Sequence, residues 1–154
     1  MPARGLEAEV ALRDVAAADL PRFFEHQRDP EASRMADFVP RDRAAFMRHW
    51  QQVVLADPSG ANQTILVAGE VAGNVLAWDQ DGKRLVGYWI DRAHWGRGVA
   101  TAALREFLAR CERTRPLHAF VALANLGSMR VLEKCGFVAV GSPEAGEQLM
   151  RLAD

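Results

Sequence analysis

Residues 88–101 read YWIDRAHWGRGVAT, and this stretch decides the fold class. It begins as an apolar strand that ends at Ile90, and its last residues open a strongly amphipathic helix that runs to about Arg113. Between the two elements, Gly96 and Gly98 form a glycine-rich turn. The first amides of a helix have no partner within it, and the helix dipole gives them positive character. The turn is therefore predicted to bind an anion such as a phosphate or a pyrophosphate.

Two other phosphate-binding motifs fit this turn poorly. A P-loop needs Gly-Lys-Ser/Thr after its second glycine, and residues 88–101 contain no lysine. A Rossmann turn needs a third glycine and lies on the first βα unit, whereas this turn follows three predicted antiparallel strands. A plain turn with convenient glycines is the remaining alternative, and the residues that flank the turn make it less favoured.

Hydrophobic periodicity predicts the other elements. The predicted strands cover residues 10–13, 64–68, 71–78, 85–90, 117–123, 137–140 and 148–152. The predicted helices cover residues 16–27, 41–56, 98–113 and 126–135, and a short helix near 31–35 lies in a loop. The order β-α-α-β-β-β-α-β-α-β-β predicts a single α/β domain over residues 1–154, with a mixed, mostly antiparallel central sheet flanked by helices.

The composition is that of an ordinary globular domain. The 154 residues carry 19 Lys and Arg against 20 Asp and Glu, and this near-zero net charge argues against a dedicated nucleic-acid binder. The longest uncharged stretch, residues 116–129, is too short to span a bilayer, and the first ten residues have no apolar core for a secretory signal. We expect a cytoplasmic protein that binds neither nucleic acid nor membrane, as a monomer or a homodimer.

The cysteines and histidines predict no metal site. Cys111 and Cys135 lie far apart in apolar periodic stretches, which predicts two small buried side chains in a reducing compartment. The four histidines show no spacing typical of metal ligands.

Two motifs at the expected spacing resemble one known family. Residues 95–100, WGRGVA, resemble the Q/R-x-x-G-x-G/A signature of the GNAT superfamily of acyl-CoA-dependent N-acyltransferases, with Trp95 in place of the usual Gln or Arg. Residues 125–137, NLGSMRVLEKCGF, look like the N-x-x-S-x-x-x-x-E-K-x-G-F block of the Rim-like branch, which contains the ribosomal-protein N-terminal acetyltransferases. The resemblance covers essentially the whole chain. It implies the GNAT fold and an acetyl-CoA-dependent N-acetyltransferase acting on a primary amine of a small molecule or a protein N-terminus.

The resemblance also implies how acetyl-CoA is bound. The turn and the helix start would bind the pyrophosphate, chiefly through backbone amides, and comprise Trp95, Gly96, Arg97, Gly98, Val99, Ala100 and Thr101. Thr101 would either contact phosphate or cap the helix. The backbone of Ile90 would hydrogen-bond the pantetheine arm and help to polarise the thioester carbonyl. Asn125 would contact the pantetheine, although asparagine also favours the N-cap of a helix.

Acyl transfer needs two proton events, and these select the catalytic candidates. The attacking amine must be neutral, and the departing CoA thiolate must be protonated or stabilised. Many family members have a tyrosine as the acid where this chain has Leu132. Ser128 is therefore the first candidate for this role, and Tyr88, the single tyrosine, is the second. No base is obvious, and the acidic residues that could line the acceptor cleft are Glu25, Asp29, Glu31, Asp37 and Asp79, with a water chain as the alternative.

The sequence is consistent with three alternative functions. The first is direct acetyl transfer within a ternary complex, because no cysteine has the context of a nucleophile. The second is a non-catalytic CoA-binding module of the same fold, acting as a sensor or an interaction protein. The third is a nucleotide-binding module of an unrelated α/β class.

Overall fold

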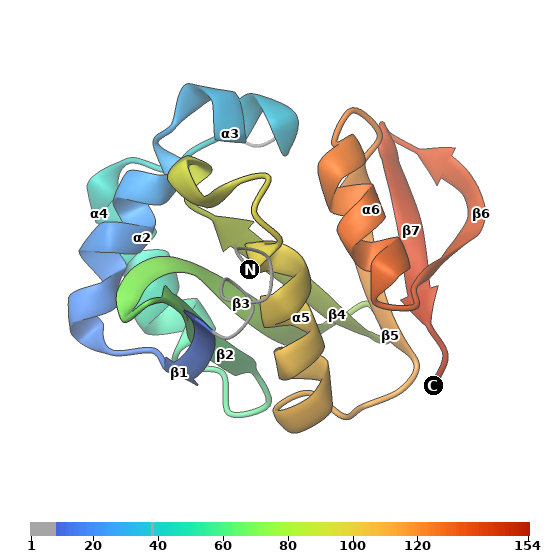
Figure 1. Ribbon diagram of the computed structural model, residues 1–154, viewed down its shortest axis with the longest axis horizontal. Helices are drawn as coiled ribbons and strands as arrows, with labels where there is room; N and C mark the ends of the chain where they lie inside the picture. Colours follow the sequence, from blue (N-terminus) through green and yellow to red (C-terminus); the bar gives the residue numbers. More distant parts are fainter. Residues whose placement is uncertain (1–8, 38) are drawn as a thin grey trace.

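The computed structural model describes residues 9–37 and 39–154, which form a seven-stranded sheet with helices on both faces (Figure 1). The strands are β1 (Val10–Asp14), β2 (Ala61–Val67), β3 (Glu70–Gln80), β4 (Lys83–Ile90), β5 (Leu117–Ala122), β6 (Val138–Glu144) and β7 (Glu147–Leu152). The α-helices are α2 (Leu20–Gln27), α3 (Pro30–Met35), α4 (Arg43–His49), α5 (Val99–Arg110) and α6 (Leu126–Lys134). Three further helical segments are η1 (Ala17–Asp19), η2 (Trp50–Val54) and η3 (Arg92–His94).

The strands lie in the order β1-β2-β3-β4-β5-β7-β6. All neighbours are antiparallel except β4 and β5, which run parallel on either side of α5 in the chain. The predicted mixed, mostly antiparallel sheet is therefore confirmed, as is the order of its elements. The predicted short helix near residues 31–35 is α3, and most predicted boundaries differ from the observed ones by a few residues.

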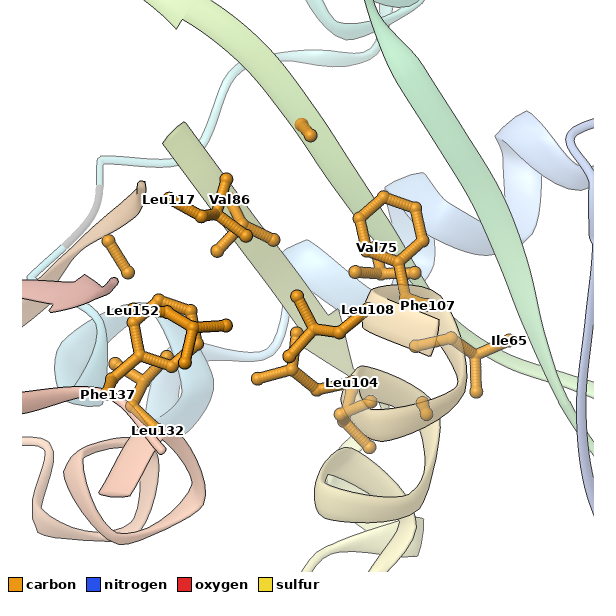
Figure 2. Close-up of a cluster of buried hydrophobic side chains, with 14 of the residues drawn as sticks. Ile65, Val75, Val86, Leu104, Phe107, Leu108, Leu117, Leu132, Phe137 and Leu152 are labelled. Carbon is orange, nitrogen blue, oxygen red and sulfur yellow. The ribbon is translucent and has the colours of Figure 1, made fainter. Parts of the chain in front are cut away.

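One hydrophobic cluster joins α5 and α6 to the sheet (Figure 2). Leu104 and Phe107 of α5 are at most 1% exposed, and Phe107 packs near Val75 of β3. Leu132 of α6 and Phe137 belong to the same cluster and are each 2% exposed. Burial of such side chains stabilises the fold by roughly 1.5–3 kcal/mol each. The hydrophobic periodicity of residues 98–113 thus predicted the face of α5 that packs against the sheet.

The other face of the sheet is covered by an aromatic cluster from α2, α4 and η2. Its buried members are Leu20, Phe23, Phe24, Phe46 and Trp50. The prediction of one α-helix over residues 41–56 is wrong, because α4 ends at His49 and continues as the π-helical segment η2. A π-helix turns less per residue than an α-helix, so the side chain of Val53 no longer follows the buried stripe and is 56% exposed.

The prediction that both cysteines are buried is also wrong. Cys111 follows the last residue of α5 as its C-cap and is exposed, because the helix ends before the apolar stripe would carry this side chain onto the sheet. Cys135 is half-buried, and both thiols are free.

Within residues 9–37 and 39–154, no helix has the length and apolar character to cross a membrane. The same part of the chain contains no group of three or more His, Cys, Asp or Glu side chains that could hold a metal ion.

Candidate active site

A cleft opens where β4 and β5 diverge. The described register between these parallel strands consists of the pair Leu85 and His118, while β4 continues five residues further to Ile90. Beyond that pair, the backbone of β4 on the β5 side has no strand partner in the described part of the chain. An extended ligand with amide groups can use such an edge as an added strand would. The cleft has a volume of about 510 Å³ and lies between this edge, the first turn of α5 and one face of α6.

The glycine turn forms one end of the cleft. Gly96 and Gly98 have φ angles of 71° and 77°, and a Cβ atom at either position would meet nothing within 4 Å. Gly98 is the N-cap of α5, so the amides of residues 99–101 are the unpartnered first amides of this helix. Thr101 is the third residue of the helix and therefore does not cap it. The backbone of the turn is thus free of side-chain obstruction on the side where the sequence predicts an anion.

Nearly all predicted site residues line this cleft. The lining includes Tyr88, Ile90, Trp95, Gly96, Gly98, Val99, Ala100, Thr101, Asn125 and Ser128. Arg97 is exposed, and its side chain is not part of the lining.

The side chain of Trp95 is hydrogen-bonded to the last residue of β4. Its indole Nε1 donates a hydrogen bond of 2.9 Å to the carbonyl oxygen of Ile90. The backbone amide of the next residue, Asp91, donates to the carbonyl oxygen of Ala72 at 2.8 Å. The carboxyl end of β4 is thereby held between β3 and the glycine turn. Trp95 therefore holds in place the backbone that was predicted to bind pantetheine.

A chain of hydrogen bonds crosses the cleft from α6 to β4. Asn125 is the N-cap of α6, and its side-chain Oδ1 accepts the backbone amide of Ser128 at 3.1 Å. The Oγ of Ser128 lies 2.7 Å from the phenolic oxygen of Tyr88, and either atom can be the donor. The two candidate acids therefore form one hydrogen-bonded pair. Burial raises the pKa of Tyr88 to about 12, and the bond to Ser128 opposes this shift, so the phenol remains a proton donor at neutral pH.

Two cations of α6 face the glycine turn across the cleft. Arg130 and Lys134 are spaced four residues apart, so they lie on the same face of the helix, and both line the cleft. Among the described residues, neither side chain forms an ion pair or a hydrogen bond. Together with the amides of the turn, they suit a ligand that carries several phosphate charges.

None of the five acidic residues considered as a base lines the cleft. Four of them are ion-paired: Glu25 with Arg28, Asp29 with Arg92, Glu31 with Arg34, and Asp79 with Arg84. The fifth, Asp37, is exposed and has a positive φ of 52° in the turn after α3.

Sequence reasoning missed a buried cluster beside the carboxyl end of β4. His94 lines the cleft, and its Nδ1 lies 3.7 Å from Oδ2 of Asp91. His26 of α2 approaches the same oxygen at 3.9 Å, and both histidines are buried. Burial lowers the pKa of His26. The two histidines are 68 positions apart in the sequence, so spacing could not reveal that they converge.

Gly73 was missed as well. It pairs with Ile90, and a Cβ atom at this position would lie 2.1 Å from the carbonyl oxygen of Trp89. Only glycine therefore allows β3 to run this close to the end of β4. The isolated glycine inside a predicted strand was the available signal.

Comparison with known proteins agrees with this geometry. The family model for the acetyltransferase (GNAT) domain matches residues 9–138. YjcK of Bacillus subtilis (strain 168), described as a probable N-acetyltransferase, is 47% identical over 55 residues, which are 34% of this chain and 30% of that protein. The matched stretch thus spans under a third of the length of that relative.

Solved structures share the fold over nearly the whole chain. An acetyltransferase from Thermus thermophilus has a TM-score of 0.78 and 19% identity, with 95% of this chain and 97% of that chain covered. The aminoglycoside acetyltransferase AAC(6')-Ib in complex with coenzyme A has a TM-score of 0.74 and 21% identity, with 94% of each chain covered. The family match over residues 9–138 and the glycine turn at the opening of the cleft lead to one conclusion: the chain belongs to the GNAT family of acetyltransferase domains.

Proposed function

We propose that this protein transfers the acetyl group of acetyl-CoA directly to a primary amine within a ternary complex. The observation that carries the proposal is the cleft itself. At one end it has a glycine turn and helix start suited to pyrophosphate, along one side it has the unpaired edge of β4, and across it lies the Tyr88–Ser128 pair.

The residues present fit acetyl-CoA. The turn around Gly98 offers backbone amides without side-chain obstruction, and Arg130 and Lys134 add positive charge opposite it. The edge of β4 up to Ile90 offers hydrogen-bonding groups to the amides of a pantetheine arm. Asn125 uses Oδ1 as the cap of α6, which leaves its Nδ2 able to donate into the cleft.

Acetyl-CoA supplies the thioester, and the neutral amine attacks its carbonyl carbon while the carbon–sulfur bond breaks. The amine loses one proton to water or to a base, and the sulfur gains one. In this scheme the hydroxyl of Ser128, backed by the phenol of Tyr88, donates to the departing sulfur. The pair regains its proton from solvent, so the protein returns to its starting state.

The cysteines favour direct attack over a covalent acetyl-enzyme. Burial raises the pKa of Cys135, which disfavours the nucleophilic thiolate, and this residue does not line the cleft. Cys111 lies at the far end of α5 from the glycine turn.

Two-substrate kinetics test the proposal. Initial rates are measured with acetyl-CoA and a panel of primary amines, both concentrations are varied, and released CoA is detected with a thiol reagent. Direct transfer predicts intersecting double-reciprocal lines and no mass increase of the protein after incubation with acetyl-CoA alone. Parallel lines with an acetylated protein would replace direct attack by a covalent route. Tight acetyl-CoA binding without transfer to any amine would favour the non-catalytic module.

A further inference from the structure

The acceptor end of the cleft has an apolar wall. It is lined by Ala32 and Met35 of α3, by Ala36, which follows this helix, and by the half-buried Trp89 of β4. In Figure 1, α3 lies above the loop that leads to the glycine turn, and α6 lies to its right. Because the phosphates belong at the turn and the thioester beside Tyr88, the amine is left to enter along the wall formed by α3.

This wall is fixed to the rest of the protein. Asp29 is the N-cap of α3, and its Oδ2 lies 3.0 Å from Nε of Arg92 in η3. The buried Ser33 donates a hydrogen bond of 2.9 Å to the carbonyl oxygen of Gln27. These contacts hold α3 in place, so its apolar side chains form a fixed part of the cleft surface that an acceptor would contact.

Two carboxylates of this wall are ion-paired, and Asp37, which follows it in the chain, is exposed and does not line the cleft. Asp29 is paired with Arg92, and Glu31 is paired with Arg34. Asp91 lies between two imidazoles and is not a lining residue. Within the described part of the cleft, no carboxylate lines the surface, so a second ammonium group on an acceptor would be desolvated without a counter-charge.

We infer that the acceptor is a primary amine attached to an uncharged, apolar body, and that polyamines and aminoglycosides are poor substrates. This inference rests on the proposed acetyl transfer and adds the class of substrate. A burial cost opposes each additional charge, whereas an alkyl or aryl group gains favourable burial against the wall formed by α3.

A matched pair of amines tests the inference. n-Pentylamine and cadaverine have the same carbon chain, and cadaverine carries one further ammonium group. We expect kcat/KM of the wild-type protein to favour n-pentylamine by at least about tenfold, because the second ammonium group of cadaverine would lose its hydration without a counter-charge. Leucinamide and an uncharged peptide that begins with leucine carry the same α-amine and the same side chain. Comparison of their kcat/KM values shows whether the protein prefers a small-molecule amine or the N-terminus of a peptide.

A charge placed on the wall should change this preference. Met35→Glu supplies the missing counter-charge and should raise the cadaverine to n-pentylamine ratio of kcat/KM by about tenfold. Val53→Glu adds the same charge on η2, at an exposed position outside the cleft, and should leave the ratio unchanged. The wild-type comparison needs no variant, so the inference can still be tested if Met35→Glu does not fold.

The possible failures are distinguishable. Equal or faster use of cadaverine, or no acetylation of n-pentylamine and leucinamide by a protein that binds acetyl-CoA, would overturn the inference. Failure of the wild-type protein to bind acetyl-CoA in calorimetry would instead contradict the proposed function. A preference for n-pentylamine that is lost in Met35→Glu and kept in Val53→Glu would support both the apolar acceptor and the proposed acetyl transfer.

Discussion

The phenolic oxygen of Tyr88 and the hydroxyl of Ser128 lie 2.7 Å apart, joining β4 to α6 across the cleft. These residues are 40 positions apart in the sequence, and each was a separate candidate for the catalytic acid. The two hydroxyls therefore form one hydrogen-bonded pair. Because burial raises the pKa of Tyr88, its phenol stays protonated and can donate to Ser128.

Removing either hydroxyl should slow turnover while acetyl-CoA still binds. We expect Ser128→Ala to lower kcat by about 10- to 100-fold, the lower range for a proton-transfer group. Tyr88→Phe should have a smaller effect in the same direction, and the double variant should be no slower than Ser128→Ala, because the two act in series. Rates are measured with saturating acetyl-CoA. Wild-type turnover in Ser128→Ala would assign the acid to Tyr88 alone or to water.

The glycine turn should control cofactor affinity. Gly98→Val forces a branched residue to a φ of 77° at the N-cap of α5, so the amides that face the cleft must move. We predict at least a tenfold loss of acetyl-CoA affinity in calorimetry, or roughly 1.4 kcal/mol. Gly82→Val is the matched control, because Gly82 has a φ of 76° in a hairpin turn away from the cleft. Equal affinity in a folded Gly98→Val protein would remove the turn from the binding site.

Asn125 should affect both stability and kinetics. Asn125→Ala removes the cap of α6 and should lower the free energy of unfolding by about 1 kcal/mol. If its Nδ2 also holds the pantetheine, the KM for acetyl-CoA should rise. Asp42→Ala removes the equivalent cap of α4, where Oδ1 accepts the amide of Ala45 at 2.8 Å, and should lower stability alone. Unaltered kinetics in both variants would leave Asn125 with a capping role only.

Trp95→Phe should weaken acetyl-CoA binding without a direct contact to the reacting atoms. The indole bond of 2.9 Å to Ile90 holds the end of β4, and loss of one such bond corresponds to about 1 kcal/mol. The KM for acetyl-CoA should therefore rise about fivefold while kcat changes less. Trp78→Phe, which removes an exposed indole bond to Gln80, serves as the control. An effect on kcat alone would contradict a positioning role.

Acid should destabilise the protein through Asp19. A bidentate bond from Arg13 at 2.7 and 2.8 Å, with further donors from Thr64 and Ala16, holds the pKa of this buried carboxyl at about 2. Because the folded value lies below the unfolded one, about 2 kcal/mol of stability is present above pH 4 and is lost as the pH falls toward 2. Urea unfolding between pH 2 and 5 measures this slope. Asp19→Asn should flatten it, and an unchanged slope would rule out this carboxyl as its source.

Much of this structure was predictable because its signals are local. The apolar strand, glycine turn and amphipathic helix of residues 88–101 predict a strand, an anion site and a helix in order. The capping preference of asparagine predicted that Asn125 could begin α6, and Asn125 is the N-cap of that helix.

The rest depends on distances between residues that are remote in sequence. The convergence of His26 and His94 on Asp91 follows from α2 packing beside the end of β4, and no spacing encodes it. The acids near the cleft were candidate bases by position, yet pairs such as Asp29 and Arg92 form only through the fold. The exposed Val53 reflects a change from α- to π-helix, which periodicity does not detect.

The most direct test of the central claim, that this cleft binds acetyl-CoA through the glycine turn, is an amide NMR titration of the ¹⁵N-labelled protein with CoA. We expect the largest shift changes on the backbone amides of residues 96–101 and on the side-chain amide of Asn125, with smaller changes along β4 up to Ile90. Saturable binding whose largest changes lie elsewhere, with residues 96–101 unperturbed, would contradict it.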